Sequence, residues 1–294
     1  MIIAQITDHH LTANGKLHGG AIAVNDKLRA VIQRLNALAP APDVILATGD
    51  LTADGQPEEY EQLRDILGEA QAPVYLIPGN HDDPDALRSH FPRSGYLPTE
   101  GFAHYVVDDY PLALIGLDTT APGTHRGEMC AARLDWLEAR LEERRDKPVL
   151  IFMHHPPFRS GIWWMDAIGL KGRRKLARLV SRYGNIERVV CGHLHRPIQT
   201  RWAGTVGSVA PSTAFFVALD LGGQKFMTLH DEPAGFDLHV WSERDGLVTH
   251  TCSLERSEGF VPEGLLSPEA LEKVRAELKR IEAEIEAADN EDGG

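Results

Sequence analysis

Five short segments of the sequence place acidic, histidine or asparagine side chains directly after runs of apolar residues. They are Asp8-His9-His10, Gly49-Asp50, Gly79-Asn80-His81-Asp82, His154-His155-Pro156-Pro157 and Gly192-His193-Leu194-His195. Each apolar run has the length and composition of a buried strand. Because the carboxyl ends of strands form the usual site crevice of an α/β sheet, the five segments can meet although they lie far apart in the sequence.

The side chains in these segments are suitable ligands for metal ions. In Asp8-His9-His10 and in His193-Leu194-His195, residues two apart point to the same side of an extended backbone, so both can bind one ion. The donors are carboxylate oxygens, imidazole nitrogens and one amide oxygen, without a thiolate, which suits Zn, Mn, Fe or Co. One zinc ion would not use so many donors. Two divalent ions about 3.5–4 Å apart, bridged by a carboxylate, would use them all.

The elements that must hold these segments alternate between strand and helix patterns over the first two thirds of the chain. Short apolar runs predict strands, and apolar residues three or four apart predict the helices between them. The expected strands are residues 2–6, 44–47, 74–77, 149–153 and 189–191, and the expected helices are residues 23–38, 58–67, 131–143 and 173–183. This alternation indicates a layered α/β domain.

Beyond about residue 196 the pattern changes to short strands separated by Gly, Pro and Asp. Candidates are residues 199–202, 215–219, 225–229, 238–241 and 247–251. We expect them to form an antiparallel sheet that completes or caps the domain. The predicted division is a domain of residues 1–260, with the core motifs in 1–196 and the β-rich part in 197–260, followed by a helical tail of residues 261–294.

The tail has a clear helix start at Ser267 and Pro268, with Ser as N-cap and Pro at the first helical position. Apolar residues then recur at steps of three and four, at Leu271, Val274, Leu278, Ile281 and Ile285. Two interpretations remain open. The helix lies on its own domain, or it joins copies of the chain through a short heptad seam, which favours a dimer or higher homo-oligomer.

Composition and charge exclude several classes of protein. The chain has 294 residues and a formal charge of −13, which disfavours a surface for polymeric nucleic acid. The apolar runs are far shorter than the roughly 20 residues that span a bilayer, so no membrane partner is expected. The N-terminus has the pattern of a strand and not of a signal peptide. The three cysteines form no C-x-x-C motif, which favours a reducing compartment and a cytoplasmic location.

The five segments, in this order, resemble the signature of the calcineurin-like metallophosphoesterase superfamily, whose fold is a four-layer αββα sandwich. Residues 75–83, Tyr-Leu-Ile-Pro-Gly-Asn-His-Asp-Asp, and residues 151–157 look like a narrower bacterial group. That group holds binuclear glycerophosphodiesterases and class III cyclic-nucleotide phosphodiesterases. Pro57-Glu58-Glu59-Tyr60, and Asn36-Ala37-Leu38 before Pro42-Asp43, also look like the glycerophosphodiesterases. The resemblance implies an α/β sandwich core, which the β-rich cap and the terminal helix would extend.

Carried over by motif, the resemblance implies roles for individual residues. Asp50 would bridge the two ions and would be catalytic together with His81, and the substrate would contact Asn80, His81 and His195. His154 would be the ligand of the His-His-Pro segment, with His155 in a supporting role. The first ion would be held by Asp8, His10, Asp50 and His195, and the second by Asp50, Asn80, His154 and His193. His9 points away from both neighbours on a strand, so we interpret it as structural.

The expected function is hydrolysis of a small phosphodiester, of the glycerophosphodiester or 3',5'-cyclic nucleotide type, by a hydroxide that bridges two divalent ions. His81 would stabilise the transition state or protonate the leaving alkoxide. The same ligands would also serve a phosphomonoesterase or a nucleotide pyrophosphohydrolase, and this alternative stays open. Trp163 and Trp164 form a rim over the substrate, or they belong to an apolar loop that is buried against the capping strands or a second subunit. Residues 208–213 are a possible opposite rim.

Overall fold

The computed structural model of the chain describes residues 1–223, 227–255 and 267–292. The strands are β1 (Ile2–Ile6), β2 (Val44–Thr48), β3 (Val74–Ile77), β4 (Tyr105–Val107), β5 (Ala113–Leu117), β6 (Gly127–Glu128), β7 (Val149–Met153), β8 (Leu170–Lys171), β9 (Ile186–Cys191), β10 (Ile198–Trp202), β11 (Thr205–Val209), β12 (Phe216–Val217), β13 (Leu229–His230), β14 (Gly235–Ser242) and β15 (Gly246–Ser253). The helices are η1 (Ala13–Gly15, 3₁₀), α1 (Val24–Asn36), α2 (Pro57–Leu67), α3 (Pro84–His90), α4 (Ala131–Glu142), α5 (Trp163–Ala167), α6 (Arg173–Val180) and α7 (Pro268–Asp292).

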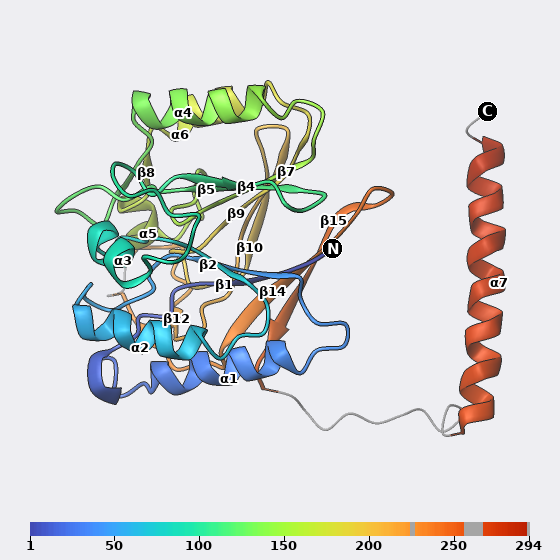
Figure 1. Ribbon diagram of the computed structural model, residues 1–294, viewed down its shortest axis with the longest axis horizontal. Helices are drawn as coiled ribbons and strands as arrows, with labels where there is room; N and C mark the ends of the chain where they lie inside the picture. Colours follow the sequence, from blue (N-terminus) through green and yellow to red (C-terminus); the bar gives the residue numbers. More distant parts are fainter. Residues whose placement is uncertain (224–226, 256–266, 293–294) are drawn as a thin grey trace. The chain divides into compact units, whose positions relative to one another are not determined.

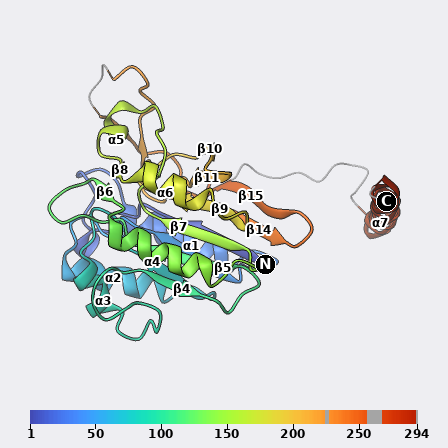
Figure 2. The same cartoon turned by 90° about the horizontal axis from the view of Figure 1, so that it is seen from above.

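Two mixed sheets form the centre of the first unit, Met1–Glu255. One has the strand order β15-β14-β1-β2-β3 and the other β10-β11-β9-β7-β5-β4. Helices α1 and α2 cover the first sheet, and α4 and α6 cover the second (Figure 1). Figure 2 shows the same layers from above, with α4 and α6 over β7 and β9. This arrangement is the four-layer αββα sandwich that the family resemblance implies.

Alternation along the strands explains why four layers form. On β2, Val44 and Leu46 pack between the sheets, whereas Ile45 and Ala47 pack under α1 and α2. On β7, Leu150 and Phe152 likewise pack between the sheets. Residues two apart lie on one face of a strand, so a continuous apolar run buries both faces of its sheet.

The parallel strands place all five predicted segments at one end of the sandwich. β1, β2 and β3 run parallel in the first sheet, and β5, β7 and β9 run parallel in the second. Asp8, Asp50 and Asn80 follow β1, β2 and β3, while His154 and His193 follow β7 and β9. The ends of two neighbouring sheets therefore bring the segments together.

The C-terminal strands complete both sheets and do not make one separate cap. β10 and β11 extend the second sheet, and β14 and β15 extend the first. The pair β12–β13 stands apart as a two-stranded ribbon. The expectation of one antiparallel sheet was therefore wrong in part, because local patterns do not identify a strand's partner. Of the predicted strand 225–229, residues 225 and 226 lie outside the described residues.

The second unit, Arg256–Gly294, contains helix α7. At its start the Ala270 N–H donates to Ser267 Oγ at 3.1 Å, as expected for an N-cap serine. The apolar seam, Leu271, Val274, Leu278, Ile281 and Ile285, is exposed. The other residues of the predicted tail, 261–266 and 293–294, lie outside the described residues. No helix in the described part of the chain is long and apolar enough to cross a membrane.

Candidate metal centre

The backbone around the predicted ligands is unusual. Six described residues other than glycine have a positive φ, and five of them are predicted ligands: Asp8, His10, Asp50, His193 and His195. Non-glycine residues rarely adopt this left-handed conformation, and such strain persists only where the surrounding structure enforces it. The strand ends therefore turn sharply and direct these side chains into one space.

Asp8, His10, Asp50 and His195 each offer a ligand atom within 4.8 Å of those of the others. His10 Nε2 lies 3.1 Å from His195 Nε2 and 3.6 Å from Asp50 Oδ2. His195 Nε2 lies 3.3 Å from Asp8 Oδ1. All four side chains are buried. The four residues predicted to hold the first ion thus surround a common point.

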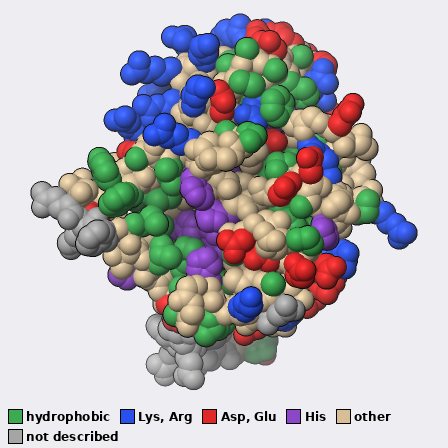
Figure 3. All heavy atoms as spheres, turned by 90° about the vertical axis from the view of Figure 1, so that its left-hand side faces the viewer, with side chains coloured by type: hydrophobic (Ala, Val, Ile, Leu, Met, Phe, Trp, Pro, Cys, Tyr) green, Lys and Arg blue, Asp and Glu red, His purple; other side chains and the backbone are tan. Residues whose placement is uncertain are grey.

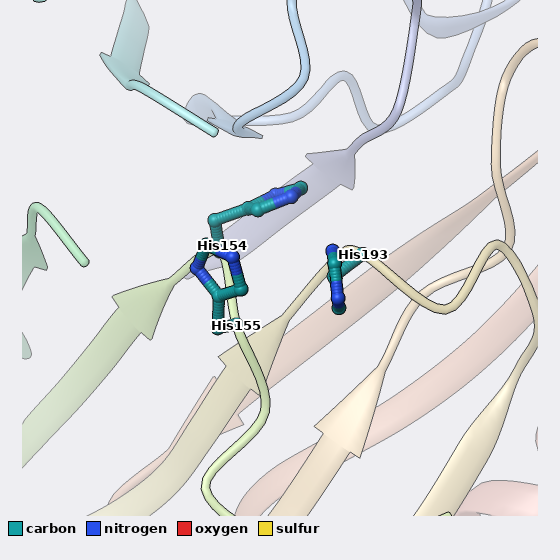
Figure 4. Close-up of side chains that lie close together, drawn as sticks. All are labelled: His154, His155 and His193. Atoms are coloured by element: carbon teal, nitrogen blue, oxygen red, sulfur yellow. The ribbon is translucent and has the colours of Figure 1, made fainter. Parts of the chain in front are cut away.

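Asp50 also borders a second group of donors. Its Oδ1 lies 3.3 Å from His154 Nε2, and Asn80 Oδ1 lies 3.2 Å from the same nitrogen. His154, His155 and His193 offer ring nitrogens within 4.8 Å of one another. Figure 4 shows these three rings grouped where β7 and β9 end. Asp50 therefore lies between the two groups of donors.

Hydrogen bonds to the ring nitrogens distinguish possible ligands from supporting histidines. His154 Nδ1 donates to the Thr48 carbonyl at 2.8 Å, and His195 Nδ1 donates to the Phe215 carbonyl at 2.9 Å, which leaves each Nε2 for a metal. Both nitrogens of His155 are engaged, Nδ1 with Thr119 Oγ1 at 2.8 Å and Nε2 with the His125 carbonyl at 3.1 Å. His155 therefore has no free nitrogen for an ion.

Unpartnered atoms in the site fit a bound cation. His193 Nε2 and His10 Nδ1 are buried without a hydrogen-bond partner among the described residues. A buried polar atom without a partner is costly, and an ion would supply the missing interaction for His193. The oxygen and nitrogen donors, with no thiolate among them, are those of Zn, Mn, Fe or Co sites.

The electrostatics of the site point the same way. Burial lowers the pKa of His10 and of His193 well below the usual value, which keeps both imidazoles in the neutral form that binds metals. Burial lowers the pKa of His154 too, but the Asp50 carboxylate outweighs it and raises this pKa to about 9. Burial raises the pKa of the Asp8 carboxyl. Positive charge near Asp8 and Asp50 would therefore stabilise the site, and a divalent cation would provide it.

The strand-end segments lie so close together that glycine is required between them. A β-carbon on Gly79 would lie 2.1 Å from the Asp50 nitrogen and 2.3 Å from Asp50 Oδ1. One on Gly192 would lie 2.1 Å from Thr7 Oγ1. Neither distance is possible for a real side chain. These glycines therefore let the backbone of one segment approach the ligand of another.

Asp82 joins the segments that follow β2 and β3. Its carboxylate accepts hydrogen bonds from the Leu51 and Thr52 N–H groups at 3.0 Å and from the Gly79 N–H at 2.8 Å. Next to it, the His81 N–H donates to Asp50 Oδ1 at 2.9 Å, and His81 Nδ1 donates to the Ala53 carbonyl at 2.7 Å. The hydrogen bond from Nδ1 thus orients the His81 ring, and Nε2 takes no part in it.

A pocket of about 290 Å³ opens over the donors. Donor residues line one side, and apolar residues line the other: Met165, Ile168, Phe215, Val217, Met227 and Leu229. Helix α5 supplies Met165, and the ribbon β12–β13, in which Val217 pairs with Leu229, supplies two more of them. In Figure 3 the histidines are visible in a hollow with hydrophobic side chains beside it. We name this apolar side the slot wall.

The pocket also contains two histidines that the sequence analysis missed. His125 Nδ1 lies 3.1 Å from Asn80 Nδ2, and the His18 ring stacks on Phe215 with centroids 4.7 Å apart. Both line the pocket. They lie in loops and follow no strand, so no local signal identified them.

Contacts decide several further expectations. His9 is buried and its Nδ1 lies 2.7 Å from Thr213 Oγ1, outside both donor groups, as expected for a structural residue. Residues 208–213 form no rim, because they are buried and Ser212 Oγ donates to the Asp8 carbonyl at 2.9 Å. Trp163 and Trp164 are exposed and do not line the pocket, so they are not buried against the C-terminal strands; burial against a second subunit stays a prediction.

Comparison with known proteins agrees with this geometry. Residues 1–197 match the family model described as Calcineurin-like phosphoesterase. The chain is 36% identical over 218 residues to a glycerophosphodiester phosphodiesterase of Enterobacter lignolyticus, covering 72% of this chain and 77% of that protein. It is 29% identical over 213 residues to the 3',5'-cyclic adenosine monophosphate phosphodiesterase of Escherichia coli K12, covering 72% and 75%.

Among solved structures, a dimetal phosphatase from Danio rerio shares the fold, with a TM-score of 0.60 at 14% identity. The match covers 87% of this chain and 99% of that one. Since the family model spans more than half of the chain, the protein belongs to the calcineurin-like phosphoesterase family.

Proposed function

We propose that this member of the calcineurin-like phosphoesterase family hydrolyses small phosphodiesters with two divalent metal ions. The convergence of seven donor side chains from five strand ends carries this proposal. We assign one ion to Asp8, His10, Asp50 and His195, and the other to Asp50, Asn80, His154 and His193. When bound, the ions would supply the positive charge that attracts the phosphate and activates a water molecule. Their identity among Fe, Mn, Zn and Co stays open.

His81 is the proposed acid or transition-state stabiliser. The hydrogen bond from its Nδ1–H to the Ala53 carbonyl fixes the ring. Both His81 and His10 line the pocket. Nε2 is thereby available to the phosphate or to the leaving oxygen. General acid catalysis of this kind contributes typically 10²–10⁴-fold to the rate. Together with Asn80 and His195, His81 would contact the substrate.

The lining of the pocket favours a diester over a monoester. None of the described lining residues is Lys or Arg. A phosphomonoester carries up to two negative charges at neutral pH and would rely on the ions alone, whereas a diester carries one. The two relatives named above are both diesterases. A phosphomonoesterase on the same ligands remains the alternative.

The slot wall favours a substrate with a planar apolar group, such as a nucleobase, over glycerol. Glycerol hydroxyls placed against Ile168 or Leu229 would lose their hydrogen bonds to water and gain none from the protein. Burial of an aromatic ring at the same place is favourable. Leu229→Asn is therefore expected to lower kcat/KM for a cyclic nucleotide about tenfold, with little change for glycerophosphoethanolamine. Leu219→Asn, which alters an exposed leucine outside the pocket, is the matched control.

The activity test compares bis(p-nitrophenyl) phosphate with p-nitrophenyl phosphate, using protein stripped of metal and reloaded with Mn²⁺. Strong metal-dependent cleavage of the diester is expected, and preference for the monoester would support the alternative. His81→Ala should lower turnover while the bound metal stays constant. Loss of metal in that variant would overturn the role of His81.

Assembly and location remain predictions. The exposed apolar seam of α7 supports self-association through this helix, and light scattering that finds a monomer would refute it. The three free cysteines are in keeping with a cytoplasmic location.

A further inference from the structure

Exposed apolar side chains lie on the two segments that also carry residues of the slot wall, helix α5 and the residues after β12. Trp163 is 53% exposed, and Leu219 and Leu221 are 61% and 64% exposed. The two segments that carry them touch, since a β-carbon on Gly223 would lie 3.0 Å from Trp163 Cβ. Met227 and Leu229 connect this apolar rim to the slot wall. An exposed apolar patch of this kind marks a surface that meets a partner or a membrane.

A group of cations adjoins the rim. α5 and β8 border a hollow of about 480 Å³ that contains seven Lys and Arg side chains and one acid, Asp166. Asp166 accepts hydrogen bonds from Ser160 and Gly161, and Lys171 pairs with Glu128. The Arg126 guanidinium donates to the Ala167 carbonyl. Six cations thus make no ion pair with any described residue: Arg126, Arg159, Arg173, Arg174, Lys175 and Arg178. Figure 3 shows Lys and Arg side chains gathered along one edge of the face that holds the histidines.

This local charge is opposite in sign to that of the whole chain. By contrast, Arg29 on α1 and Arg144 and Arg145, which follow α4, pair with carboxylates. Charges farther away than about 8 Å are screened at physiological ionic strength, so an approaching surface is affected by the cations nearest to it and not by the net charge of −13. An anionic partner is therefore attracted to this edge.

The geometry points to peripheral docking of this face on an anionic lipid bilayer, with Trp163 and the exposed leucines at the headgroup boundary and the unpaired cations against lipid phosphates. Tryptophan beside basic residues is the combination that favours a membrane interface. Aliphatic rim residues would add little to nucleic-acid binding, whereas they can enter the apolar part of a bilayer. The expected absence of a membrane partner followed from the lack of a spanning segment, which peripheral docking does not need.

The test is sedimentation of the full-length protein with vesicles. Binding is expected with phosphatidylcholine vesicles that contain phosphatidylglycerol, weak binding with phosphatidylcholine alone, and loss of binding as salt is raised. Each basic residue near an anionic surface contributes about fivefold to partitioning. Arg173→Ala with Arg174→Ala should thus lower it about 25-fold, and Trp163→Ser should weaken it as well.

The matched control removes two cations from the opposite helical layer, with Arg29→Ala and Arg64→Ala, and should bind as the wild type does. Equal binding to both vesicle types, no binding to either, or equal loss in the control pair would overturn the proposal. Two further results would overturn it. Single-stranded DNA at equal charge could displace the protein from the vesicles, or light scattering could show that Trp163→Ser dissociates an oligomer while vesicle binding stays unchanged. Vesicle binding requires neither metal nor turnover, so its outcome is separate from that of the hydrolytic proposal.

Discussion

Replacing Gly79 by alanine tests whether close approach of the strand-end segments holds Asp50 in place. The new methyl carbon would lie 2.1 Å from the Asp50 nitrogen and 2.3 Å from Asp50 Oδ1. Carbon atoms pack against their neighbours at about 3.5 Å, so one segment must move by about 1 Å or more. The nearest of these atoms belongs to the backbone, so rotation of the Asp50 side chain cannot by itself relieve the clash.

The displacement would alter the bridging position directly. Asp50 Oδ1 lies 3.3 Å from His154 Nε2 and accepts the His81 N–H. A misplacement of about 1 Å can cost about 10²-fold in rate. Overpacking should also lower the free energy of unfolding by about 1–3 kcal/mol. We therefore expect Gly79→Ala to lose bound metal and about 10²-fold of kcat/KM on bis(p-nitrophenyl) phosphate.

Metal content after Mn²⁺ loading, diester hydrolysis and the urea midpoint of unfolding measure these effects. Gly184→Ala is the matched control, because a β-carbon there would meet nothing within 4 Å. If Gly79→Ala kept the metal content and activity of Gly184→Ala, the close approach would not be what positions Asp50, and the reasoning would be refuted.

Three further predictions concern buried groups. His154→Gln should lose metal, whereas His155→Gln should keep it, because both ring nitrogens of His155 already have partners; equal metal loss in the two variants would contradict this. Asp82→Asn replaces an acceptor of backbone N–H groups, so kcat/KM should fall about tenfold or more with partial metal loss, and unchanged metal affinity would argue against its positioning role. Burial raises the pKa of Asp237 from 3.8 to about 6, so the folded protein binds an extra proton between these values and loses up to about 3 kcal/mol of stability as pH rises through them. Asp237→Asn should lack this loss, and identical pH profiles of the urea midpoint in wild type and variant would contradict the assignment.

The sequence by itself determined the strands and helices around the site and the types of its donors. These are local properties: a buried run such as residues 149–153 has its own periodicity, and the residues that follow it are adjacent in the chain. Parallel strands end on one edge, so the convergence of Asp8, Asp50 and His154 followed from the α/β pattern.

Tertiary structure decided the features that depend on partners far away in the sequence. Pairing alone divided the C-terminal strands between two sheets, since a strand's pattern does not specify its neighbour. The slot wall required α5 and the ribbon β12–β13 to line the same pocket as the donors. His18 and His125 line the pocket but lie in loops. Loops carry no periodicity, so the positions of these two histidines could not be predicted from the sequence.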